Sequence, residues 1–209
     1  MRKLITEFIG TFFLVLTVGM VVTEGKGDFS PIAIGAVLLC MVFAGAHVSG
    51  AHYNPAVTLA VLLRGRISIA EGISYMIAQI VAAIVASYMV LFLAADKIPA
   101  EASGLQNITG GLMAELLGTF ALAYVVLNVA TAKGTIGNMF YGLAIGFTIL
   151  SMAYALAPVS GGAFNPAVAL GMMFMRLASW SNLWIYLIGC FGGAILAAIV
   201  FRINNPEDH

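Results

Sequence analysis

Asn54-Pro55-Ala56-Val57 recurs as Asn165-Pro166-Ala167-Val168, about half a chain further on, in a very apolar sequence. The stretch before each copy also matches, as Ser49-Gly50-Ala51-His52-Tyr53 and Ser160-Gly161-Gly162-Ala163-Phe164. Polar, helix-breaking residues at corresponding points of two hydrophobic halves are typical of membrane proteins built from inverted repeats, whose site lies where the repeats meet. The repeat therefore predicts a protein that moves something across a bilayer.

The composition indicates a surface that faces lipid. The chain has 209 residues, of which 62% are hydrophobic and only 9% charged, with a formal net charge of zero. A soluble domain carries charge on about a quarter of its residues. We therefore expect an integral membrane protein whose partner is the bilayer and, since no basic run is present, not nucleic acid. Cys40 and Cys190 lie in apolar stretches, which is typical of buried small hydrophobic residues rather than of a disulfide.

The apolar segments predict an all-α membrane protein. A membrane-spanning helix needs about 20 apolar residues, and six segments qualify: 4–23, 31–48, 68–94, 110–131, 137–157 and 182–202. Two apolar pieces, 54–63 and 165–175, begin at the repeated motif and are too short to cross, so we expect re-entrant half-helices. Non-helical backbone at this depth is tolerated only inside protein or along a water-filled cavity. Residues 48–53 and 159–164 are therefore expected to line a cavity. Ser30 before Pro31 favours a helix start with Ser as the N-cap.

The repeat extends beyond the short motif. Glu7 and Glu115 open matching segments, and their spacing along the chain is nearly the same as that between Asn54 and Asn165. We expect one channel domain over residues 1–209, made of inverted repeats at about 1–97 and 108–203. Three spans in each half is an odd number, so the halves must have opposite orientations in the membrane. The positive-inside rule favours cytoplasmic N- and C-termini, because one side would carry Arg2, Lys3, Arg64, Arg66, Lys133 and Arg202, and the other only Lys26, Lys97 and Arg176.

With its two Asn-Pro-Ala boxes, a Ser-Gly pair before each and an intramembrane Glu opening each repeat, the chain resembles the aquaporin and glyceroporin (major intrinsic protein) family. The resemblance covers essentially the whole chain. It implies an aquaporin-like fold, a passive channel for water and small uncharged solutes, a homotetramer with one pore in each subunit, and a place in the cell membrane. It implies no enzyme activity, no catalytic residue, no cofactor and no metal.

The motif residues have direct physical roles. Pro55 and Pro166 suit the first turn of a helix, where no backbone N–H is needed. Asn54 and Asn165 suit the N-caps, from which a remaining amide N–H can point into a lumen. Two half-helices that meet tip to tip bring their positive ends together at the membrane centre, which disfavours cations. A water molecule there only accepts hydrogen bonds from the Asn amides, which interrupts a proton wire.

The resemblance assigns roles to residues around these motifs. It implies a ladder of pore carbonyls at Gly50, Ala51, His52, Gly161, Gly162 and Ala163, with the His52 imidazole packing structurally. It also implies that Glu7 and Glu115 brace the backbone N–H groups of the re-entrant loops. Charged groups inside a membrane are costly without such partners. A proton relay is the less favoured reading of the same two residues.

One position departs from the family pattern. Most members carry Arg after the second Asn-Pro-Ala box, and here Val168 takes its place. Counting back from the boxes puts the other selectivity-filter positions on Ile34, Ala153 and Gly162. None of these side chains can hydrogen-bond a solute, and the constriction should be wider than in a water channel unless another side chain fills the gap. The expected cargo is water, glycerol, urea, ammonia, hydrogen peroxide or neutral metalloid hydroxides. Alternatively, Val168 is a neutral variation and the channel conducts mainly water.

Three other functions remain open from the residues alone. A secondary active transporter shares inverted repeats and broken helices, but it generally needs titratable groups near the midplane. A non-conducting structural membrane protein would need a docking element, and the loops are short. An intramembrane hydrolase would need a nucleophile and a base in contact; His47 and Ser49 are close in sequence, without an evident third group.

Overall fold

The computed structural model describes residues 1–102 and 104–208, and all regular structure in this part of the chain is helical. Six helices are long and apolar enough to cross a membrane: α1 (Arg2–Thr23), α2 (Ser30–Ser49), α4 (Ile69–Leu93), α5 (Ile108–Val126), α6 (Tyr141–Ser160) and α8 (Leu183–Asn204). Two short helices, α3 (Pro55–Leu63) and α7 (Pro166–Phe174), begin inside the repeated motifs. The predicted all-α fold with six long and two short helices is confirmed.

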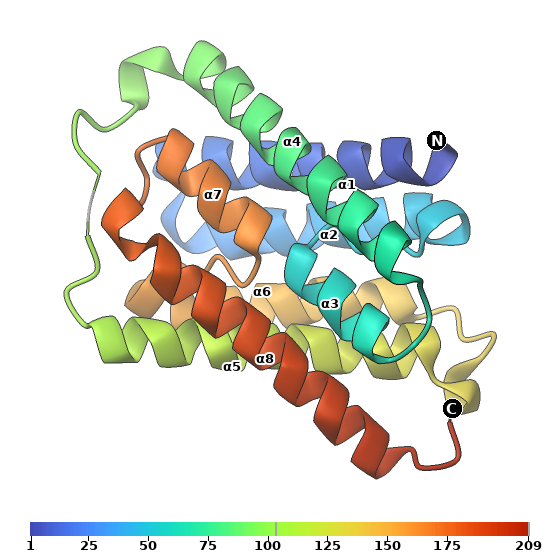
Figure 1. Ribbon diagram of the computed structural model, residues 1–209. Helices are drawn as coiled ribbons and strands as arrows, with labels where there is room; N and C mark the ends of the chain where they lie inside the picture. Colours follow the sequence, from blue (N-terminus) through green and yellow to red (C-terminus); the bar gives the residue numbers. More distant parts are fainter. Residues whose placement is uncertain (103, 209) are drawn as a thin grey trace.

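Helices of the two halves pack in matching pairs. Helices α1 and α2 lie side by side, as do α5 and α6, while α4 and α8 cross over them and α3 and α7 lie between (Figure 1). Helix α3 packs on α8 of the other half, and α7 packs on α4. Both chain ends lie at the same end of the molecule (Figure 1). The division into repeats at about 1–97 and 108–203 stays a prediction, which these matching contacts support.

The backbones of the two halves make close contact where α2 crosses α6, at two glycines related by the repeat. A Cβ atom on Gly35 would lie 2.8 Å from the carbonyl oxygen of Gly146, and a Cβ on Gly146 would lie 2.7 Å from that of Gly35. Any larger residue at either position would push the helices apart. This contact holds the two halves close enough to enclose the space between them.

Some local details differ from the sequence-based expectations. Helix α6 begins at Tyr141, because Gly137 adopts a positive φ of 81° in the preceding turn, and it continues past Pro158 to Ser160. Phe29 rather than Ser30 is the N-cap of α2, since a one-turn 3-10 helix (Gly27–Phe29) leads directly into it. Cys190 is buried but Cys40 is exposed on α2, so the prediction that both thiols are buried is wrong for Cys40.

Candidate functional site

The two asparagines of the repeated motif cap the short helices. Asn54 has the extended backbone of an N-cap (φ −157°), and its Oδ1 accepts hydrogen bonds from the N–H of Ala56 at 2.8 Å and of Val57 at 3.4 Å. Asn165 is also extended (φ −160°), and its Oδ1 accepts from the N–H of Ala167 at 2.9 Å. With Pro55 and Pro166 in the first turns, each cap has a fixed orientation.

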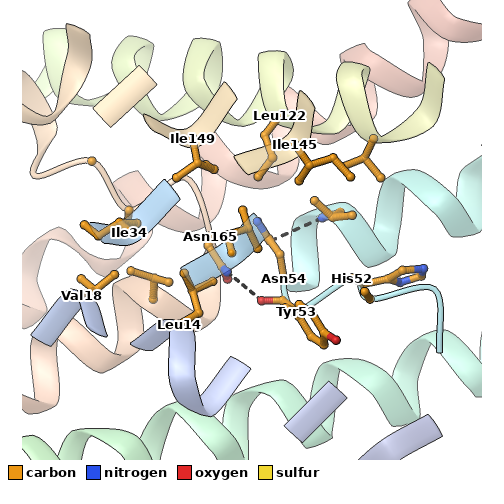
Figure 2. A pocket seen from close by; sticks show the side chains of 17 residues that line it. Leu14, Val18, Ile34, His52, Tyr53, Asn54, Leu122, Ile145, Ile149 and Asn165 are labelled. Carbon is orange, nitrogen blue, oxygen red and sulfur yellow. Dashed lines mark hydrogen bonds between the residues drawn. The ribbon is translucent and has the colours of Figure 1, made fainter. Parts of the chain in front are cut away.

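The same asparagines join the halves to each other. Asn54 Nδ2 donates to the carbonyl of Phe164 at 2.9 Å. Asn165 Nδ2 donates to the carbonyl of Tyr53 at 2.9 Å, a hydrogen bond drawn as a dashed line in Figure 2. Each amide thus uses one N–H across the repeat boundary and keeps a second. Both side chains line one central cavity, where the positive ends of α3 and α7 also meet.

Glu7 holds the loop that leads into α3. Its Oε1 accepts from the Ser49 hydroxyl at 2.6 Å and from the His52 N–H at 3.0 Å. Its Oε2 accepts from the Tyr53 N–H at 2.7 Å and from Gln79 Nε2 at 2.8 Å. The fully buried carboxylate therefore receives four hydrogen bonds, which offset its loss of hydration.

Glu115 does the same for the loop that leads into α7. Its Oε1 accepts from the Ser160 hydroxyl at 2.6 Å and from the Ala163 N–H at 3.0 Å. Its Oε2 accepts from the Phe164 N–H at 2.6 Å, and the Cys190 thiol lies 3.5 Å away. Neither Glu lines the central cavity among the described residues.

Two aromatic residues that the sequence reasoning missed complete the loops. Tyr53 and Phe164 adopt positive φ values of 49° and 48°, which side chains other than glycine rarely do. Their rings lie against Gly10 of α1 and Gly118 of α5, where an added Cβ would overlap the ring. The repeat spacings alone pair Tyr53 with Phe164 and Gly10 with Gly118, so that signal was present in the sequence.

The central cavity is small and mostly apolar. Its volume is about 30 Å³, and one water needs on the order of 10–15 Å³, so it accommodates only a very short file of molecules. The two Asn amides and the backbone of the re-entrant loops supply the polar surface. Its apolar walls consist of Leu14, Val18, Ile34, Leu38, Val57, Leu122, Val126, Ile145, Ile149 and Val168.

The predicted filter residues do not all reach this cavity. Ile34, Gly162 and Val168 line it, whereas Ala153 is buried on α6 beyond the lining residue Ile149 and is not part of the wall. A Cβ on Gly162 would lie 2.6 Å from the Cβ of Ala157, so α6 already occupies the space beside this glycine. A side chain at position 162 would therefore meet α6, and the contribution of Gly162 to the width of the filter stays a prediction.

The predicted carbonyl residues fall in three places. Ala51, His52, Gly162 and Ala163 line the central cavity, and Gly50 lines a second, larger cavity. Gly161, with φ of 89°, ends α6 as its C-cap and lines neither of the two cavities.

The larger cavity, which we call the vestibule, has a volume of about 680 Å³. It lies between the end of α2, the start of α4 and the segment 129–138, and its wall includes His47, Arg66 and Glu71. His52 and Val126 line both cavities, so the central cavity adjoins the vestibule there. The His52 ring packs edge-on against Tyr75, and its Nδ1 lies 3.1 Å from Thr58 Oγ1, which gives the imidazole a structural role.

The C-terminal tail fastens the vestibule end of α3. Asp208 Oδ1 pairs with Arg64 at 2.5 Å, and its Oδ2 accepts from the Lys133 N–H at 2.7 Å. Arg64 also lies over the Phe201 ring of α8, 4.8 Å from its centroid. Burial acts to raise the pKa of Asp208, but the Lys133 N–H and the Arg64 guanidinium together hold that pKa below its usual value. Within residues 1–102 and 104–208 no group of three or more His, Cys, Asp or Glu is placed to hold a metal ion.

Known proteins resemble this chain along almost its whole length. A sequence model of the family described as Major intrinsic protein matches residues 1–201. Glycerol uptake facilitator protein-like 6 of Lactiplantibacillus plantarum is 39% identical over 218 aligned positions that cover 100% of both chains. Nodulin-26 of Glycine max is 34% identical, and the match covers 100% of this chain and 79% of the other.

A solved structure shows the same fold. The aquaglyceroporin from Plasmodium falciparum superposes with a TM-score of 0.81, covering 99% of this chain and 97% of that one, at 23% sequence identity.

Proposed function

The chain belongs to the major intrinsic protein family, and from this membership we propose that it works as a passive channel for water and small uncharged solutes. It is an integral membrane protein with six apolar helices. The observation that carries the proposal is the pair of Asn amides, each bonded across the repeat boundary, in an otherwise apolar cavity. Water passing there accepts hydrogen bonds from the amides, which breaks a proton-conducting chain, and cations meet the positive ends of two helices.

The solute class follows from what the filter lacks. Val168 lines the cavity at the place where most relatives carry Arg, and Ile34 adds another apolar surface. Backbone carbonyls and the Asn amides are then the polar guides, so the cargo is compact and uncharged. Glycerol, urea, ammonia, hydrogen peroxide and neutral metalloid hydroxides fit this description. A relative named as a glycerol uptake facilitator-like protein supports it.

A mainly water-selective channel is the second candidate. The cavity volume of about 30 Å³ and the position of Ala157 beside Gly162 favour it, because a narrow passage admits water more readily than a three-carbon solute.

The geometry gives less support to the other functions. A coupled transporter needs titratable groups that meet the cargo, and Glu7 and Glu115 are fully buried and saturated with internal donors. Ser49 donates its hydroxyl proton to Glu7 rather than serving as a nucleophile beside His47. We propose that the protein is not an enzyme. We also propose that it forms a homotetramer with one pore in each subunit, and that it lies in the cell membrane with both termini on the cytoplasmic side.

Permeability measurements on proteoliposomes test the function. Purified protein is reconstituted, and water, glycerol, urea and proton fluxes are compared with those of protein-free vesicles. We expect water and at least one uncharged solute to cross faster than in protein-free vesicles, with no added proton flux. Equal permeability of both vesicle types for every solute would overturn the proposal.

Val168→Arg tests the filter assignment. The guanidinium would add a fixed fork of donors, a positive charge and bulk, so glycerol permeability should fall several-fold more than water permeability. Val168→Met adds length without charge and serves as the control. Arg in an apolar site is costly to desolvate, so only variants that purify as stable, homogeneous protein enter the comparison. An unchanged or higher glycerol-to-water ratio would show that Val168 does not set selectivity.

A further inference from the structure

The apolar walls of the central cavity come in pairs related by the repeat. Val18 and Val126 both line the cavity, and their spacing in sequence equals that between Glu7 and Glu115. Ile34 and Ile145 both line it as well, and their spacing equals that between the two motif asparagines. The two ends of the cavity are therefore built from equivalent positions.

Val168 itself has such a partner. Val57 holds the same place after Asn54 that Val168 holds after Asn165, in the first turn of α3 rather than of α7. Both valines are buried and both line the cavity. The asparagine pair divides the labelled wall residues of the cavity, with Val18 and Ile34 on one side and Ile145 and His52 on the other (Figure 2).

The side that contains Ile145 and His52 is the side on which the central cavity adjoins the vestibule. His52 and Val126 line both the 30 Å³ cavity and the 680 Å³ vestibule. A molecule coming from the vestibule must therefore pass these residues before it reaches the Asn amides. Val126 lines both cavities, Ile145 lies on this side of the Asn pair, and Val57 lies in the first turn of α3, whose Val61 lines the vestibule. We call Val57, Val126 and Ile145 the inner ring.

We propose that the inner ring is a second selectivity constriction, and that Val57 sets its permeability as Val168 does on the opposite side. The proposal rests on the channel function proposed above and adds a specificity-determining residue to it. A solute then loses hydrogen-bonded water at two apolar constrictions, one on each side of the polar Asn pair. A strongly hydrated solute is therefore disfavoured at two points each time it crosses the channel.

Two constrictions in series make a quantitative prediction. Val57→Thr and Val168→Thr each keep the side-chain shape and add a hydroxyl that can hydrogen-bond passing water. If the two resistances are comparable, relieving one raises water permeability by about twofold at most, because the other remains. The double variant should exceed twofold, since it relieves both. Val85→Thr, on the exposed face of α4 and outside both cavities, is the matched control.

The experiment is stopped-flow water permeability of proteoliposomes with matched protein content, for the parent and the four variants. The inner ring is refuted if Val57→Thr behaves like Val85→Thr while Val168→Thr alone exceeds twofold. Should Val57→Thr fail to purify as folded protein, Val57→Ala, which widens the same constriction, takes its place under the same criterion. A parent that passes no solute would overturn the channel function itself and the inner ring with it, which is a different result from an inert Val57.

Discussion

The two re-entrant loops have the same backbone brace and different side chains around it. Tyr75 and Tyr186 donate to the carbonyls of Ser49 and Ser160 in the same way. Beside Glu7, however, Gln79 donates to the carboxylate, whereas at the equivalent position beside Glu115 stands Cys190, with its sulfur 3.5 Å away.

The polar network around the first loop extends further. Gln79 Nε2 also donates to Thr58 Oγ1 at 3.0 Å, and Thr58 in turn meets the His52 ring. The second loop has Ala169 and Ala163 at the matching positions. The repeat thus keeps the backbone brace in both halves, while the side chains behind it are polar on the vestibule side and apolar on the other.

The C-terminal ends of the two short helices also differ, again with polar contacts in the first half and apolar contacts in the second. The C-cap of α3 is the buried Arg64, which Asp208 neutralises. The matching residue after α7 is Met175, fully buried against Gly19 of α1. One short helix is anchored by an ion pair and the other by apolar packing. The repeat therefore specifies the centre of the pore, and each end of the pore is stabilised by different interactions.

The largest expected effect comes from the two buried carboxylates. Each carboxylate oxygen of Glu7 accepts two hydrogen bonds. In Glu7→Gln an NH2 group replaces one of these oxygens. Whichever way the amide is oriented, this NH2 donor faces two other donors and cannot accept from them. A stranded buried donor costs about 1–3 kcal/mol. In Glu115→Gln the NH2 can take the Oε2 position, where it faces one N–H and a thiol. We expect both variants to lose thermal stability in detergent, and Glu7→Gln to lose more.

Glu101→Gln, on the exposed segment after α4, is the control for the loss of one negative charge. A melting temperature for Glu7→Gln equal to that of this control would show that the carboxylate is not a brace. A larger loss for Glu115→Gln than for Glu7→Gln would contradict the order that the fourth donor predicts.

The next effect, of intermediate size, concerns the caps. Asn54→Ala removes the Oδ1 that accepts from two N–H groups, together with the hydrogen bond to the Phe164 carbonyl. Asn165→Ala removes the Oδ1 that accepts from one N–H group, together with the hydrogen bond to the Tyr53 carbonyl. A lost cap costs about 1 kcal/mol, and a buried unpaired donor adds to it. Both variants should have lower melting temperatures and altered water permeability, Asn54→Ala more so.

Asn107→Ala removes an N-cap outside the cavity, where Asn107 accepts from Gly110, and isolates the cost of a cap alone. If both motif variants matched Asn107→Ala in melting temperature and kept parental permeability, the hydrogen bonds across the repeat boundary would carry neither stability nor conduction.

The sequence predicted the centre of this molecule better than its walls. The repeat spacings identified Asn54, Asn165, Glu7 and Glu115. A polar residue inside an apolar segment is unusual, and its recurrence at the same place in the second half indicates that both copies have a role. The spacings could not show that Ala153 does not line the central cavity, since this depends on how α6 packs against its neighbours. The place of Ala153 in the filter stays a prediction.

Other details depended on tertiary packing that no local pattern reports. Ala157 beside Gly162 is placed by the last turn of α6, which runs past Pro158 although proline usually ends a helix. The tail pairing of Asp208 with Arg64 joins two segments that are far apart in sequence. Nothing in either segment alone indicates that contact.

The smallest expected effect tests the anchored end of α3. Asp208→Asn removes the negative charge beside the buried Arg64 but keeps an amide oxygen that can accept from the guanidinium, so the melting temperature should fall, but less than in the Asn54 and Asn165 variants. The pKa of Asp208 is lowered in the folded protein. Its stabilising contribution is therefore fully present above the ordinary pKa of about 3.9 and is lost as pH falls below it toward the folded-state value. The difference in melting temperature between parent and variant should be constant from neutral pH to about pH 5 and shrink below about pH 4.

Glu207→Gln changes a neighbouring exposed carboxylate whose residue contacts Lys133 only through its backbone carbonyl, so it controls for tail charge. Within residues 1–102 and 104–208 no ion pair anchors the end of α7. Met175→Leu, a swap of similar volume at the matching position, should therefore show no pH dependence relative to the parent over the same range. A pH-independent loss in Asp208→Asn would mean that the tail is held by its backbone contacts rather than by its charge. The claim that an ion pair anchors the end of α3 would then be wrong. The claim that apolar packing anchors the end of α7 would not be affected.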